Sequence, residues 1–81
     1  MAFLIPTYDL AQKIGNRVEI DAKTVGDLIK EGIARFGEDF RQASAQTAIV
    51  VNGRAINHLK GRKTRLEKND TVWFLKPAAG G

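Results

Sequence analysis

The 81-residue chain contains no cysteine and only one histidine, one tryptophan and one tyrosine. Without cysteine the chain has no disulfide, thiolate metal site, thiol redox chemistry or cysteine nucleophile. The single histidine, His58, leaves no nucleophile–base pair of the usual kinds. The composition therefore predicts a cytoplasmic protein that is not an enzyme.

Long apolar runs and phosphate-binding glycine motifs are also absent. No segment approaches the roughly 18 consecutive apolar residues of a membrane span, and the N-terminus lacks the features of a signal peptide. Gly61 begins Gly-Arg-Lys-Thr, but Ile56 stands where a phosphate-binding loop has its first glycine. No carboxylates have metal-ligand spacing. We expect no membrane contact, no metal and no bound cofactor.

What the chain does have is the composition of a small folded domain. Hydrophobic residues make up 43% and charged residues 27% of the sequence, which is typical of soluble globular proteins. A chain of this length buries only about 60% of its unfolded surface, so its core is small. We assign one domain to residues 1–76 and an extended, flexible tail to residues 77–81.

The clearest pattern predicts a helix over residues 24–36. Thr24 can cap its first turn, and Gly37 follows the last apolar residue, where a left-handed cap belongs. Gly32 lies inside the apolar stripe, and we interpret it as close packing against a sheet. The stripe consists of Val25, Leu28, Ile29, Ile33 and Phe36.

The other apolar segments have the length of strands. The first two, residues 2–5 and 17–21, suggest an opening hairpin, with a loop or helical turn between them. Residues 47–51 are apolar at successive positions after Thr47, so we expect a central strand covered on both faces. Asn52-Gly53 is a strong hairpin signal. No element is assigned to the polar residues 38–46.

The last two predicted strands are residues 54–56 and 71–76. The order is then strand, strand, helix, strand, strand, strand. This order predicts an α+β fold, with one main helix packed on a sheet of about five strands.

Positive charge is concentrated in one place, the basic segment (residues 57–68). The whole chain has 13 Lys and Arg against 9 Asp and Glu. Such a segment suits an acidic partner or nucleic acid. A nucleic-acid-binding module remains an alternative, but stacking aromatic residues are not interleaved with the cations, which argues against it. The cations are Lys60, Arg62, Lys63, Arg65 and Lys68.

The C-terminal sequence Lys-Pro-Ala-Ala-Gly-Gly is the most informative feature. Pro77 favours an extended conformation at Lys76, and the four residues after it carry almost no side chain. Fully extended, these four residues reach about 13 Å, so they can enter a narrow cleft in another protein. The carboxylate of Gly81 is then the reactive group on offer. Activating it requires a partner that supplies ATP.

Over nearly its whole length, the chain resembles the β-grasp sulfur carriers, the MoaD-like and ThiS-like relatives of ubiquitin. Residues 20–29 are similar to the strand-to-helix junction of that family, and residues 50–54 to its central hairpin. Residues 69–81 resemble its ending, with an acidic turn, a hydrophobic strand, a proline and a double glycine. The resemblance implies a ubiquitin-like β-grasp fold with a mixed sheet.

The resemblance also implies a mechanism. An E1-like adenylyltransferase would adenylate Gly81 with ATP, and a sulfur donor would convert it to a thiocarboxylate. The sulfur would pass to an acceptor enzyme, such as the large subunit of a molybdopterin synthase. Gly80 would provide clearance beside the carrier site.

A docking surface for these partners is expected at the end of the last strand and in the tail. Because side chains alternate along a strand, about half of the strand residues should face the core. We expect Phe74 or Leu75 on the open face of the sheet. The candidate docking residues are Trp73, Phe74, Leu75, Pro77 and Ala79.

Molybdopterin synthesis is the first choice of pathway, with cysteine and thiamine biosynthesis as alternatives. Lys76 stands where MoaD-like chains often have proline, and Ala78 where valine is usual. Residues 5–7, Ile-Pro-Thr, resemble the N-terminus of carriers used in cysteine biosynthesis. A further alternative is a protein modifier that joins Gly81 to lysines of targets. Deleting residues 80–81 should abolish carrier or modifier function and leave nucleic-acid binding intact.

Overall fold

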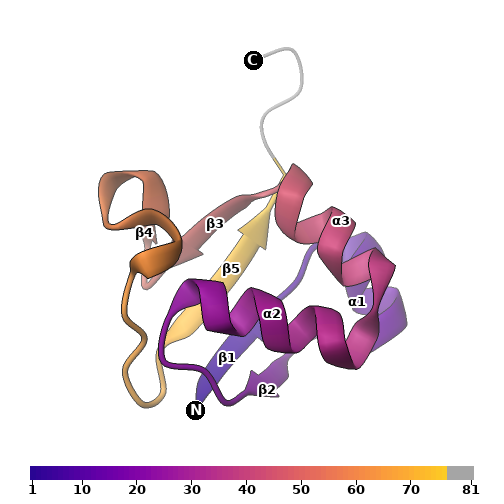
Figure 1. The fold of residues 1–81 in the computed structure, drawn as a ribbon. Coiled ribbons are helices and arrows are strands. Elements are labelled where there is room, and N and C mark those ends of the chain that lie inside the picture. The colour runs from indigo at the N-terminus through magenta and orange to yellow at the C-terminus, as the bar shows by residue number, and fades with distance from the viewer. Residues whose placement is uncertain (77–81) are drawn as a thin grey trace.

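The computed structural model describes residues 1–76, and the tail predicted for residues 77–81 lies outside the described residues. This part of the chain forms five strands and three α-helices, and Figure 1 shows how they are arranged. The strands are β1 (Ala2–Ile5), β2 (Val18–Ile20), β3 (Ala48–Val51), β4 (Arg54–Ala55) and β5 (Thr71–Leu75). The α-helices are α1 (Tyr8–Ile14), α2 (Val25–Phe36) and α3 (Glu38–Gln46), and two 3-10 turns, η1 (Ile56–His58) and η2 (Gly61–Lys63), follow β4.

The strands form one mixed sheet in the order β2-β1-β5-β3-β4. β1 pairs with β2 in antiparallel fashion, which confirms the predicted opening hairpin. β1 and β5 run parallel, while β3 is antiparallel to both β5 and β4. Helix α2 lies across one face of this sheet (Figure 1). The predicted α+β architecture, with one main helix on a mixed sheet, is confirmed.

The core lies between the sheet and helices α2 and α3. Leu4, Val72 and Val51 are neighbours across β1, β5 and β3, and all three are buried. Helix α2 contributes Leu28 and Ile29, which are at most 2% exposed. Burying a side chain of this size stabilises the fold by about 1.5–3 kcal/mol, so the apolar stripe seen in the sequence becomes the main packing surface.

The predicted ends of α2 and the β3–β4 turn are confirmed. The Asp27 amide donates a hydrogen bond to Thr24 Oγ1 at 3.1 Å, which caps the first turn. Gly37 ends the helix at φ 78° and ψ −150°, a positive-φ conformation that glycine adopts without strain. Asn52 and Gly53 also have positive φ, 50° and 87°, as the hairpin turn requires.

Helix α3 is an addition to the predicted elements, because the polar residues 38–46 had no element assigned. Its one large apolar side chain, Phe40, is completely buried. A Cβ placed on Gly32 would lie 2.1 Å from Phe40 Cζ. The absence of a side chain at Gly32 therefore leaves room for Phe40 of α3. The prediction that Gly32 packs closely against the sheet was wrong. The Phe40 ring also meets Phe74 of β5 edge-on, with centroids 5.5 Å apart.

Two strand predictions also need correction. β3 is covered on one face only: Ile49 and Val51 are buried, whereas Ala48 is exposed and Val50 half-buried. An apolar residue at every position therefore reflects an uncovered apolar face rather than two covered ones. Ile56 begins η1 instead of continuing β4. Between β1 and β2, the segment left open as loop or helical turn is helix α1.

No helix within residues 1–76 combines the length and the apolar character that crossing a membrane requires.

Candidate functional site

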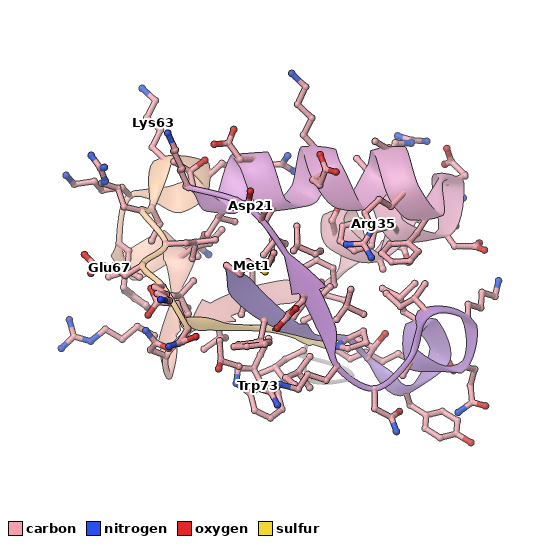
Figure 2. The ribbon with its side chains drawn as sticks, turned by 90° about the horizontal axis from the view of Figure 1, so that it is seen from below. Met1, Asp21, Arg35, Lys63, Glu67 and Trp73 are labelled. Atoms are coloured by element: carbon pink, nitrogen blue, oxygen red, sulfur yellow. The ribbon has the colours of Figure 1, made fainter. Side chains whose placement is uncertain are left out.

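The predicted docking residues of β5 divide between the two faces of the sheet. Phe74 is 1% exposed and packs in the core, whereas Trp73 and Leu75 are 41% and 44% exposed. Because neighbouring side chains on a strand point to opposite faces, a partner can reach Trp73 and Leu75 but not Phe74. Phe74 is therefore corrected from a docking residue to a core residue. Figure 2 shows Trp73 on the side of the sheet away from α2.

Trp73 and Leu75 belong to a larger apolar surface, which we call the open face. Ile5 of β1 and Val50 of β3 are the register partners of Trp73, and Ala48 is the partner of Leu75. Residues in register share a face, so these apolar side chains lie side by side. Ala48, Trp73 and Leu75 are exposed, whereas Ile5 and Val50 are half-buried. Exposed apolar side chains that gather on one face typically mark an interaction site. The open face consists of Phe3, Ile5, Ala48, Val50, Trp73 and Leu75.

A hollow of about 340 Å³ borders the open face at the end of β5. Trp73 and Leu75 form one part of its wall, and Pro6 and Tyr8 at the start of α1 form another. Tyr8 is 77% exposed and was missed as a candidate residue. The sequence feature that could have identified Tyr8 is its position, two residues after Pro6, which ends the first strand.

The point where the chain leaves the sheet, Lys76, is bound to helix α1. Lys76 Nζ lies 2.9 Å from Asp9 Oδ2. One turn along α1, Lys13 Nζ lies 2.9 Å from Asp39 Oδ2 of α3. Both ion pairs border a second hollow of about 350 Å³ between α1 and α3. Helix α1 thus connects the end of β5 with α3.

Four of the predicted site residues lie beyond this point. Gly81, Gly80, Pro77 and Ala79 are outside the described residues. Their roles in activation and docking therefore stay predictions. The last described residue, Lys76, directly follows Leu75 at the end of β5.

The basic segment lies elsewhere, against the beginning of α2. The Val25 amide donates to the Thr64 carbonyl at 3.0 Å, and the Leu66 amide donates to the Lys23 carbonyl at 2.8 Å. Thr64 and Leu66 are buried, so the segment is anchored. Its predicted cations are exposed, and among residues 1–76 none of them forms an ion pair. These cations are Lys60, Arg62, Lys63, Arg65 and Lys68.

The structure therefore separates the two predicted surfaces. In Figure 2, Lys63 lies on the α2 side of the sheet and Trp73 on the opposite side. A partner bound to the open face would leave the Lys63 side of the molecule accessible.

One pair of titratable side chains on α3, Glu38 and Arg41, has shifted pKa values. A hydrogen bond from Arg41 lowers the pKa of Glu38 below its usual value. Both side chains are exposed at the start of α3, so this shift belongs to a surface ion pair. Within residues 1–76, no three His, Asp or Glu side chains gather closely enough to hold a metal ion. Residues 1–76 thus present two surfaces on which a partner could dock, the open face and the basic segment.

Comparison with known proteins finds a matching family and a similar protein sequence. The profile of the ThiS family matches residues 9–81. A small archaeal modifier protein 3 from Haloferax volcanii is 38% identical over 72 residues, which cover 80% of this chain and 76% of that protein.

Three solved structures share the fold at low sequence identity. CysO from Mycobacterium tuberculosis, described as an antigen, gives a TM-score of 0.85 at 17% identity, covering 96% of this chain and all of that one. CysO in the BexX/CysO complex of Amycolatopsis orientalis gives 0.82 at 20% identity, with both chains fully covered. Small archaeal modifier protein 1 from Methanosarcina acetivorans gives 0.80 at 19% identity, covering 99% and 95%. These likenesses confirm the ubiquitin-like β-grasp fold.

Proposed function

Since this chain belongs to the ThiS family, we propose that it is a sulfur carrier that partner enzymes activate and load at Gly81. The family consists of small carrier and modifier proteins rather than enzymes. The observation that carries the proposal is that the family match extends through residue 81. It therefore includes the terminal Gly80-Gly81, and the last described residue before the tail, Lys76, follows an apolar face that a partner can cover.

The chemistry needs no acid, base or nucleophile from the folded domain. A carboxylate oxygen of Gly81 attacks the α-phosphorus of ATP on an E1-like adenylyltransferase, and pyrophosphate leaves. Sulfide supplied by a sulfur donor then attacks the acyl carbon, and AMP leaves. The product is a thiocarboxylate at Gly81. This division of labour agrees with a sequence that contains one histidine and no cysteine.

The folded domain would contribute recognition. The aromatic side chain of Trp73 lies at the centre of the open face. The aliphatic side chain of Leu75 lies at the end of the open face that is nearest to Lys76. Large apolar side chains that become fully desolvated carry most of the energy of an interface. Docking there would bring the start of the tail, after Lys76, close to the partner's active site.

For the pathway, we keep molybdopterin synthesis as the proposed destination of the sulfur. An enzyme resembling the large subunit of a molybdopterin synthase would then be the acceptor. Support comes from the ending of the chain, residues 69–81, which resembles the ending shared by MoaD-like and ThiS-like carriers. Lys76 and Ala78 depart from the residues usual in MoaD-like chains. Cysteine and thiamine biosynthesis remain the alternative destinations.

A protein modifier is the second candidate function. The observation in its favour is the 38% identity to a small archaeal modifier protein. The two functions share the adenylated Gly81 and diverge at the next step. Attack by sulfide gives a thiocarboxylate, whereas attack by a lysine amine of a target gives an isopeptide bond.

The deciding experiment is the mass of the untagged protein isolated from its own cells. If Gly81 carries a thiocarboxylate, one oxygen is replaced by sulfur. Oxidation of Met1 adds nearly the same mass, and Met1 is 57% exposed, so the change must be localised. Trypsin cleaves after Lys68 but not before Pro77, so the informative peptide is residues 69–81.

The same digest also detects the modifier. A conjugated target would carry residues 69–81 as a branch on one of its lysines, and this branch is far longer than a Gly-Gly remnant. Deletion of residues 80–81 is the control and should remove either product. An unchanged carboxylate without conjugates, even with ATP and the cell's adenylating enzyme, would contradict both functions.

A further inference from the structure

Helix α1 uses two side chains of opposite charge, one turn apart, to connect two other elements. Asp9 pairs with Lys76 and Lys13 pairs with Asp39, each at 2.9 Å. Residues four positions apart lie on the same face of a helix. One face of α1 therefore makes contact with both the end of β5 and helix α3.

The position of α1 is itself fixed by the fold. Leu10 is 4% exposed and packs in the core. The first turn of the helix is closed by a hydrogen bond of 2.8 Å from the Ala11 amide to the Thr7 carbonyl. Asp9 lies between these anchored positions, so its carboxylate is presented from a rigid support.

Lys76 is the residue at which the paired chain becomes the tail. The last register pair of β5 joins Leu75 to Ala48, so strand pairing ends one residue before Lys76. Pro77 restricts the backbone of Lys76 to extended conformations. The ion pair with Asp9 restrains the side chain of the same residue. Backbone and side chain are thus constrained by two independent means.

We propose that Asp9 is a positioning residue for the tail: its ion pair with Lys76 fixes the direction in which the chain leaves the sheet. This proposal rests on the proposed function, in which Gly81 must enter the active site of an adenylating partner. A tail that starts in the right direction loses less conformational freedom on binding, and such preorganisation strengthens binding without any new contact.

The size of the effect follows from the exposure of the pair. The side chains of Lys76 and Asp9 are 67% and 73% exposed, and exposed ion pairs contribute little because water and salt screen them. Loss of the pair should therefore change binding by about two- to fivefold. It should not unfold the domain.

The first test needs no partner. The heteronuclear ¹⁵N NOE of the Ala78 amide, the first amide after Pro77, reports how far the ion pair orders the start of the tail. Asp9→Asn should lower this NOE, while Asp9→Glu, which keeps the charge, should preserve most of it. Glu38→Gln is the matched control, because it breaks an equally exposed ion pair with Arg41 on α3. An Ala78 NOE unaffected by Asp9→Asn would overturn the proposal.

The second test measures activation with the cell's adenylating enzyme, ATP and the carrier as substrate. Asp9→Asn and Lys76→Gln should each raise KM for the carrier about two- to fivefold with kcat unchanged. The double variant should be no worse than either single variant, because both remove the same interaction. Additive effects, or a change in kcat alone, would contradict a positioning role.

The two tests keep the proposals apart. If the enzyme does not adenylate even the wild-type chain, the sulfur-carrier proposal fails. The NOE of Ala78 still decides whether Asp9 orders the start of the tail.

Discussion

At the scale of single residues, Gly32 and Phe40 show how an absent side chain can set the position of a helix. Phe40 is the one large apolar residue of α3 and is completely buried. Its ring occupies the space where a Cβ on Gly32 would stand. The glycine in the middle of α2 therefore accounts for the close approach of α3.

Gly32→Ala gives a prediction whose sign is decided by packing. Helix propensity alone favours alanine by about 1 kcal/mol. The added methyl group would lie 2.1 Å from Phe40 Cζ, and overpacking of this kind costs about 1–3 kcal/mol. We expect a net loss of stability in urea denaturation followed by circular dichroism.

The control for this prediction is a smaller side chain at position 40. In the Phe40→Leu background, Gly32→Ala should cost less than in the wild type, because the methyl group has more room. Coupling between the two positions would appear as non-additivity of the two substitutions. A more stable Gly32→Ala variant would show that α2 and α3 are not packed this closely.

At the scale of elements, alternation along β5 assigns its residues to two functions. Val72 and Phe74 fill the core, while Trp73 and Leu75 form part of the open face. A strand that carries apolar side chains on both faces can thus contribute to stability and to recognition. The same explanation applies to β3, where Ile49 is buried and Ala48 exposed.

Helix α3 offers a test by pH. The hydrogen bond from Arg41 Nε to Glu38 Oε1, at 2.9 Å, stabilises the ionised carboxylate and lowers its pKa. A lowered pKa stabilises the fold at pH values above the usual carboxyl pKa, and this contribution is lost as the pH falls through the pKa of the folded state.

We expect the ¹³C titration of the Glu38 carboxyl to have its midpoint below the usual glutamate value. Arg41→Gln should move that midpoint upward, because the donated hydrogen bond and the positive charge are both removed. Asp39→Asn is a control on the same turn and should leave the direction of the Glu38 shift unchanged. A Glu38 midpoint that does not respond to Arg41→Gln would contradict the ion pair.

At the scale of the whole molecule, the two candidate surfaces lie on opposite sides of the sheet. The open face carries Trp73, and the basic segment carries Lys63 beside the start of α2 (Figure 2). The sequence placed these residues only ten positions apart. The fold directs them away from each other, so substitutions on one surface should not disturb the other.

The prediction at this scale concerns which surface the activating partner uses. Trp73→Ser combined with Leu75→Ser should raise KM for the carrier roughly thirtyfold, as expected when residues at the centre of an interface are lost. Lys63→Gln combined with Arg65→Gln is the matched control and should change KM by less than about threefold. Circular dichroism should show that both variants remain folded.

The opposite result would change the interpretation of the molecule. If the basic variant loses activation and the open-face variant does not, the partner recognises charge through the anchored segment. Affinity of the wild type for DNA that falls steeply with salt would then favour the nucleic-acid alternative. If Trp73 and Leu75 form the docking surface, we expect neither the loss of activation in the basic variant nor the salt-dependent affinity for DNA.

The sequence by itself determined the elements whose signals are local. The apolar stripe from Val25 to Phe36, the cap at Thr24 and the turn at Asn52-Gly53 depend on residues close together in the chain. The resemblance of the ending at residues 69–81 also needs no structure. These features were sufficient to predict the α+β fold and a carrier activated at its C-terminus.

Only the tertiary structure decided which side chains are covered. Phe74 and Leu75 are equally apolar in the sequence, and the position of α2 on one face of the sheet makes one a core residue and the other a surface residue. Gly32 acquired its role from Phe40, and Lys76 its partner from Asp9, at 67 residues' separation. Contacts between distant residues leave no periodic pattern in the chain, because the folded arrangement itself brings them together.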